Sequence, residues 1–223
     1  MKNSAYLNKK TQIYSDIYSW ATLALSHPQN DGSIADTLEI LEEINIAAKR
    51  DSNLDLSKEL EELIDDQKIR QLDLLFLQQE HSRLFIGPFA LLAPPYESYY
   101  RGKHTLMGEI SSEVEKFYHC AGMDISPDFK DAPDHIILET EFLARLCEIE
   151  AAALEKNEHD RTAALKDLQL SFLQKHLLTW IDTLQVTLEK AALSRFYPVI
   201  VRVINKTARD HYLSLQETGE SNA

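Results

Sequence analysis

The chain has 223 residues, with 23 Lys and Arg against 36 Asp and Glu, and a formal net charge of −13 at pH 7. This charge opposes nucleic acid and anionic lipid as ligands and favours basic partners. A chain of this length buries roughly 70–75% of its unfolded surface, so it needs neither disulfides nor a metal to hold a core.

The two cysteines, Cys120 and Cys147, are too few for a disulfide framework. We expect both to be small core residues in a reducing compartment. The sequence contains no basic-then-apolar N-terminal signal and no uninterrupted apolar run of about 18 residues. It therefore predicts a soluble, cytoplasmic protein without stable membrane insertion.

Helix signals are continuous and strand signals are nearly absent. None of the six glycines lies between Gly122 and Gly219, which favours long helices in the second half. In the first half, the apolar spacing predicts four helices. They run from Ser4 to His27-Pro28, from Ser33 to a break at 49–53, over 56–64, and from Ile69 to Leu84.

The last of these helices leads into an apolar loop over residues 86–98. Three of the seven prolines lie there: Pro88, Pro94 and Pro95. Proline fixes its own φ and pushes the preceding residue toward extended geometry, so we expect no helix in this loop. Loops are normally polar, and an apolar loop is either folded into the core or shaped to hold an apolar ligand.

In the second half, an apolar stripe over 110–121 predicts a helix that ends at a C′ glycine, Gly122. The segment 123–133 holds two prolines and several aspartates and is typical of a hinge. Asp134 is placed to cap the next helix. Further helices are expected over 138–153, 165–173 and 181–188, and from Arg195.

The predicted fold is all-α, a single bundle of about nine to eleven helices in two sub-regions. The N-terminal sub-region covers 1–122, the hinge covers 123–133, and the C-terminal sub-region covers 134–215. The polar tail 216–223 is expected to fray. A hinge of this kind also allows two copies to exchange halves, so we expect a monomer or a domain-swapped homodimer.

Motifs for catalysis are missing: there is no glycine-rich phosphate loop, no Gly-x-Ser-x-Gly and no Cys-x-x-Cys. His135 and Glu139 are four residues apart and share a helix face. They predict a structural hydrogen bond or ion pair, or alternatively a metal or acid–base role, which would require further ligands. His176 and Trp180, also four apart, are interpreted as a core or helix-junction pair.

Three motifs together resemble the TorD/DmsD-type redox-enzyme maturation chaperones. The first is Leu84-Phe85-Ile86-Gly87-Pro88 with Pro94-Pro95-Tyr96-Glu97-Ser98-x-Tyr100. The second is Pro133-Asp134-His135-Ile136 with Glu139-x-x-Phe142-Leu143. The third is Phe172-Leu173-x-x-His176-Leu177-x-x-Trp180 with Phe196-Tyr197. They occur in the family's order and span most of the chain from about Tyr6 to Leu213.

This resemblance implies an all-helical cytoplasmic chaperone without catalytic residues, metal or cofactor. It would bind the N-terminal signal of a molybdopterin-containing oxidoreductase subunit, usually a twin-arginine leader, and delay export until the cofactor is in place. Such a leader has a basic start and an apolar middle, so its receptor needs an apolar groove beside negative charge. The proline loop can supply the apolar wall, with Leu91, Leu92, Pro95 and Tyr96.

The acidic side of the groove is assigned to Asp134 and Glu97, because a carboxylate binds a guanidinium in bidentate fashion. By motif position, the resemblance implies a signal-peptide site of Leu84, Phe85, Pro95, Tyr96, Ser98, Asp134 and His135, and Glu97 completes the predicted site. Two positions depart from the family pattern, since some relatives have Trp at the position of Tyr96 and many have Glu at that of Ala132.

Two alternative functions stay open at this point. The first is an assembly chaperone for a molybdoenzyme subunit that is not exported, as in a nitrate-reductase-like enzyme. The second is a helical metal-dependent hydrolase built on His135 and Glu139. Binding of a nucleotide or of the molybdenum cofactor is equally open.

Overall fold

The computed structural model describes residues 2–29, 32–52, 54–70, 73–87, 91–102 and 108–220. These residues form helices and turns with no β-strand, which confirms the predicted all-α class. The helices are α1 (Lys2–Leu25), α2 (Gly32–Asp51), α3 (Ser57–Arg70), α4 (Leu74–His81), α5 (Glu97–Arg101), α6 (Glu109–Cys120), α7 (Ile136–Glu155), α8 (His159–Lys175), α9 (Ile181–Ala191) and α10 (Phe196–Glu220). A π-helical turn, η1 (Ser82–Ile86), follows α4, and a 3₁₀ turn, η2 (Leu177–Thr179), precedes α9.

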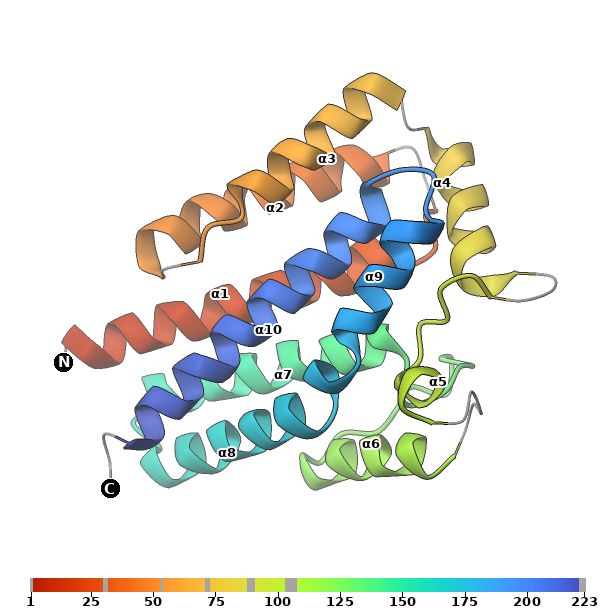
Figure 1. Cartoon of the computed structure of the whole chain (residues 1–223). Coiled ribbons are helices and arrows are strands. Elements are labelled where there is room, and N and C mark those ends of the chain that lie inside the picture. Colours follow the sequence, from red (N-terminus) through yellow and green to blue (C-terminus); the bar gives the residue numbers. More distant parts are fainter. Residues whose placement is uncertain are drawn as a thin grey trace.

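Helix α1 lies in the centre of the bundle and packs against α2, α7 and α10 (Figure 1). Helix α10 also contacts α3, α8 and α9, and α8 packs on α7. The largest fully buried side chains come from both halves of the sequence: Trp20, Trp180, Tyr18, Tyr197 and Phe172. Both predicted sub-regions therefore contribute to one hydrophobic core. The division at 123–133 and the half-exchanged dimer stay predictions.

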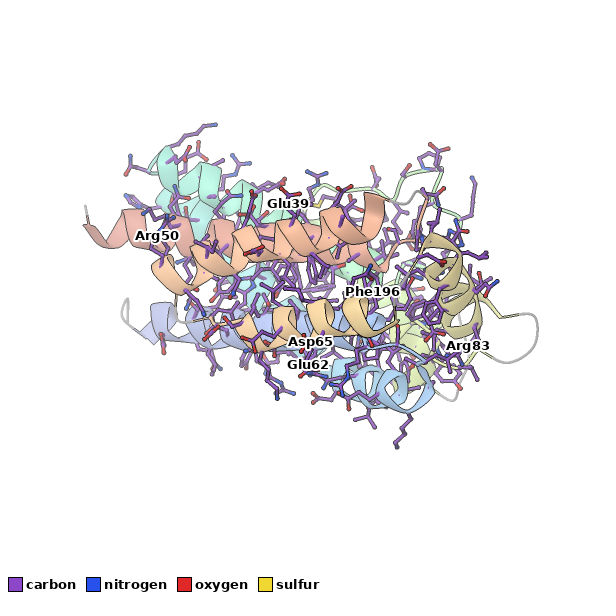
Figure 2. All side chains as sticks on the ribbon, turned by 90° about the horizontal axis from the view of Figure 1, so that it is seen from above. Glu39, Arg50, Glu62, Asp65, Arg83 and Phe196 are labelled. Carbon is purple, nitrogen blue, oxygen red and sulfur yellow. The ribbon has the colours of Figure 1, made fainter. Side chains whose placement is uncertain are left out.

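Helix α3 is joined to α10 by carboxylates that recur on one face. In the view from above, α3 lies over α10 and carries Glu62 (Figure 2). Glu62 pairs with Arg195 at 3.1 Å and with Arg202 at 2.9 Å. One turn on, the Asp66 carboxylate accepts a hydrogen bond from the backbone N–H of Arg195 at 2.7 Å. These contacts fix the start of α10 against the end of α3.

The fourth helix and the proline loop differ from the sequence-based prediction. The fourth helix was expected from Ile69, but Ile69 lies in the last turn of α3. Helix α4 begins at Leu74, after Asp73, whose side chain accepts a hydrogen bond from the Phe76 amide at 2.7 Å. Leu72, and Pro88 in the loop, lie outside the described residues. The prediction of no helix in the proline loop was wrong at its end, because α5 begins at Glu97.

The predicted cap of α7 was also wrong. His135 is the N-cap residue, and its Nδ1 accepts a hydrogen bond from the Ile137 amide at 3.1 Å. Asp134 is turned away because its carboxylate binds the start of α5 instead. Gly122 does adopt a positive φ of 72° after α6, as a C′ glycine should.

Three further expectations can be compared with the structure. Cys147 is buried as predicted, but Cys120 is exposed because it lies on the outer face at the end of α6. Helix α10 continues to Glu220, so residues 216–220 of the expected frayed tail are helical, and 221–223 lie outside the described residues. Among the helices described, none is both long and apolar enough to cross a membrane.

Candidate functional site

The polar residues of the first two motifs meet inside the protein. Asp134 is fully buried, and its two carboxylate oxygens accept hydrogen bonds from the Ser98 amide at 2.7 Å and the Ser111 hydroxyl at 2.5 Å. The backbone continues this contact as a single antiparallel bridge between Tyr96 and His135. Asp134 therefore holds the end of the proline loop against the start of α7.

The first and third motifs are joined by Glu97 and His176. Both side chains are buried, and His176 Nδ1 donates to the Glu97 carboxylate at 3.0 Å. Arg101, one turn along α5, forms an ion pair with the same carboxylate and also donates to the Lys175 carbonyl at 2.8 Å. The Glu97 charge is thus neutralised within the chain.

The second and third motifs are joined by Glu139 and Trp180. Glu139 is fully buried and accepts a hydrogen bond from the Trp180 indole N–H at 3.2 Å. Burial, reinforced by the nearby Glu97 carboxylate, raises the pKa of Glu139 well above its usual range. Glu139 and His135 have separate partners, and the described residues contain no group of three His, Cys, Asp or Glu that could hold a metal. No geometry here supports the hydrolase alternative.

A groove opens beside this network, between the proline loop, the end of α1 and the start of α7. Its volume is about 210 Å³. It is lined by Leu25, Ser26, His27, His81, Phe85, Ile86, Pro95, Phe129, Asp131, His135, Ile136 and Ile137. Three of the eight predicted site residues, Phe85, Pro95 and His135, are in that lining.

The other predicted residues lie behind the groove. Tyr96 is 8% exposed and packs edge-on against the His135 ring, with ring centroids 5.2 Å apart. Leu84, Glu97, Ser98 and Asp134 are at most 2% exposed and support the groove from inside. Leu91 and Leu92, expected to form the apolar wall, are not among the lining residues. Whether any of the eight residues contacts a peptide stays a prediction.

Two of the groove histidines, His81 and His135, are kept neutral at pH 7 by burial. Burial lowers the pKa of His135 to about 4, although Asp131 and Asp134 act in the opposite direction. Because His135 Nδ1 accepts a hydrogen bond from the Ile137 amide, the neutral ring carries its proton on Nε2. Burial likewise lowers the pKa of His81 to about 4.

Asp131 supplies the negative charge of the groove. Asp131 is exposed at the rim of the groove. Burial raises the pKa of Tyr96, and the interaction of its hydroxyl with the Asp131 carboxylate raises that pKa further. The sequence-based site missed Asp131, together with Phe129, His27 and His81. The sequence does contain a sign of this charge, because the segment 123–133 holds several aspartates.

A second cavity of about 430 Å³ lies between the 123–133 segment and the outer face of α7. Most of its lining is apolar: Tyr118, Met123, Ile125, Phe129, Leu138, Phe142 and Ile149. Phe129 lines both cavities. The sequence-based site contains none of these residues.

Residues 48–185, more than half of the chain, match a sequence model of the family described as "Nitrate reductase delta subunit". The chain belongs to the nitrate reductase delta subunit family. The matched region contains all eight predicted site residues, and it also contains the α7 residues that line the groove and the second cavity.

Three proteins that are similar in sequence to this chain are named as chaperones. "Chaperone protein TorD" of Vibrio parahaemolyticus is 25% identical over 174 residues, which is 75% of this chain and 78% of that protein. "Chlorate reductase assembly chaperone protein" of Ideonella dechloratans is 32% identical over 80 residues, 36% of this chain and 40% of that protein. A "Selenate reductase assembly chaperone protein" of Thauera selenatis is 30% identical over 99 residues, 43% of this chain and 49% of that protein.

A solved structure supports the fold of the family. The crystal structure of an Archaeoglobus fulgidus protein assigned as a redox enzyme maturation protein has a TM-score of 0.50 and 20% sequence identity, and the match covers 91% of this chain and 93% of the other. The resemblance to redox-enzyme maturation chaperones is therefore confirmed. All three relatives are named as chaperones, in agreement with the expected non-catalytic function.

Proposed function

We propose that the chain is a cytoplasmic chaperone for the assembly of a molybdopterin-containing oxidoreductase subunit. It binds the N-terminal twin-arginine leader of that subunit and holds it until cofactor insertion and folding are complete. Family membership and the assembly chaperones among the relatives support the chaperone part of this proposal. The groove between Pro95 and His135 supports the leader part.

One observation carries the choice of ligand: an exposed carboxylate, Asp131, stands at the rim of a groove whose walls are apolar and aromatic. An arginine side chain needs both features, because its guanidinium pairs with a carboxylate while its methylene stem packs on apolar surface. The His135 Nε2–H can donate to a backbone carbonyl of the leader. Glu97 and Asp134 are placed to shape the groove from behind, since both are buried with partners of their own.

The test is a titration of the whole protein with a synthetic twin-arginine leader, followed by calorimetry. We expect Asp131→Asn to weaken binding by about tenfold or more, since a charge-assisted hydrogen bond contributes roughly 1.5–3 kcal/mol. The matched control is Asp128→Asn, an exposed aspartate three residues earlier that lines neither cavity. Raised salt should weaken binding to the unmodified protein. Equal affinities of the Asp131 variant and the unmodified protein would argue against the guanidinium contact.

A second candidate is an assembly chaperone for a subunit that is not exported, which the family description favours because it names nitrate reductase. In that case the leader carries no arginine pair, and Asp131→Asn leaves its binding unchanged. The start of the client gene, sought among the neighbouring genes, distinguishes the two candidates.

A further inference from the structure

The groove at His135 is too small to hold a leader by itself. Its volume of about 210 Å³ is below the range of roughly 300–1,000 Å³ that ligand pockets usually occupy. It can take one large side chain and its neighbours. A leader that also contains an apolar run must place that run on another part of the surface.

The cavity on the other side of the 123–133 segment has the size and the chemistry for it. Its volume is about 430 Å³, and Met123, Ile125, Leu138 and Ile149 are only half-buried although they belong to its apolar lining. These side chains therefore leave apolar surface in contact with water. Covering that surface is favourable by about 25 cal/mol for each Å².

Arg145, at the rim of this cavity, is paired with acidic residues of its own helix. Arg145 lies 3.9 Å from Glu141 and 2.9 Å from Glu148, and Asp124 lies 3.4 Å from the His119 ring nitrogen. The groove differs in charge from this cavity, because its lining includes the exposed carboxylate of Asp131. An uncharged, apolar ligand suits the cavity, and a cation suits the groove.

Phe129 connects the two. It lines both cavities, and its ring meets the His135 ring edge-on, with centroids 5.8 Å apart. A ligand that fills the larger cavity can therefore pack against Phe129, which itself contacts His135. The two binding spaces therefore share one wall, the Phe129 side chain.

We infer that the larger cavity binds the apolar stretch that follows the arginine pair of the leader, so that one leader occupies two subsites on either side of Phe129. This inference rests on the proposed function. The polarity of each subsite matches one part of the leader. The basic residues of the leader lie beside Asp131, and the apolar residues that follow lie against Ile149 and Met123. Because the two spaces share the Phe129 wall, they suit two parts of a ligand that are close to each other in sequence.

The decisive variant is Ile149→Glu, which places a charge in the apolar subsite. Ile149 is half-buried on α7, so the new carboxylate can reach water, and glutamate is a good helix former, so the helix can keep its fold. The matched control is Ile46→Glu on α2, where the isoleucine is 60% exposed and lines neither cavity. We expect leader affinity to fall by about tenfold to a hundredfold in the Ile149 variant and to be unchanged in the control.

A second protein variant and a modified leader test the apolar subsite independently of Ile149→Glu. Met123→Ser, in the loop, should weaken leader binding in the same direction. A leader whose apolar stretch is replaced by serine should bind the unmodified protein more weakly, and Ile149→Glu should then cause little further loss, because both changes remove the same contact. Circular dichroism confirms that each variant is folded before its affinity is used.

The outcomes separate the inference from the proposed function. If Asp131→Asn weakens leader binding while the Ile149 and Met123 variants bind normally, the second subsite is refuted and the proposed function stands. If the folded, unmodified protein does not bind the leader at all, the proposed function fails, and the inference with it. Loss of affinity in both subsites, with both controls unchanged, supports the two-subsite arrangement.

Discussion

Asp134 stabilises the start of α5 from a distant part of the sequence: its Oδ2 accepts a hydrogen bond at 2.7 Å from the amide of Ser98, 36 residues earlier. The neighbouring backbone adds two more bonds, from the Glu97 amide to the Asp134 carbonyl at 3.1 Å and from the Ile136 amide to the Pro95 carbonyl at 2.9 Å. Together these contacts determine where Tyr96 and His135 stand. The groove is therefore built on a buried capping interaction.

Replacing Asp134 by alanine should destabilise the protein strongly. The change leaves the Ser98 amide and the Ser111 hydroxyl without their acceptor in the interior, and it removes a helix cap. We expect the free energy of unfolding to fall by about 2–4 kcal/mol, measured by urea denaturation. Asp128→Ala, an exposed control, should change it by less than about 0.5 kcal/mol. A loss no larger than that of the control would show that the buried cap contributes nothing.

Glu139→Gln should alter the pH dependence of stability. Burial raises the pKa of Glu139 above its usual 4.5, so the folded protein holds a proton that the unfolded chain releases above pH 4.5. The free energy of unfolding of the unmodified protein therefore falls as pH rises from about 4.5 toward the folded-state pKa, by up to about 1.4 kcal/mol per pH unit. The glutamine variant lacks this decline, so its relative stability should increase with pH. Parallel denaturation profiles between pH 4.5 and 7 would contradict the prediction.

Arg83 should be important for stability although it is partly exposed. It donates to the buried Glu80 carboxylate at 2.9 and 3.0 Å and to the Ala191 carbonyl at 2.7 Å, which ties the turn after α4 to the end of α9 (Figure 2). Arg83→Ala leaves the Glu80 charge without its cation, so we expect a loss of about 2–3 kcal/mol in unfolding free energy. Arg145→Ala is the comparison, because its ion pairs are exposed and should contribute less than about 1 kcal/mol. Similar losses in both variants would disprove the special role of Arg83.

Gly122→Ala tests the end of α6. Gly122 has a φ of 72°, and a Cβ there would meet no atom within 4 Å, so the cost comes from backbone conformation alone. We expect about 1–2 kcal/mol of destabilisation by thermal or urea denaturation. Gly108→Ala is a useful comparison, because its Cβ also has open space while its φ is −115°. The Gly108 variant should therefore lose less than the Gly122 variant.

The helices could be predicted from sequence where their signals are local. The apolar stripe of α6 and its final glycine are contiguous in the chain, and both predictions are confirmed. Helix α5 was missed because its cap, Asp134, belongs to a distant segment, and a proline-rich stretch gives no local reason to expect a helix. Tertiary contacts decided that boundary.

The candidate site, too, could be predicted from local motifs only in part, because the rest depends on tertiary contacts. The family motifs located the right region, and Phe85, Pro95 and His135 do line a groove. The motifs could not show which acids face solvent, because burial is a property of the packed bundle. Asp134 is inside it, while Asp131, three residues earlier, is at the surface.

The length and direction of α1 have a practical consequence. The helix has 24 residues, about 36 Å at 1.5 Å per residue, and its last turn leads directly to Leu25 and His27 in the groove lining. Its first turn lies at the opposite end of the bundle, where α10 also finishes (Figure 1). A fluorophore or affinity handle attached at the first turn of α1 or the last turn of α10 would therefore lie far from the groove, and protein immobilised through such a handle should keep its full capacity for ligand.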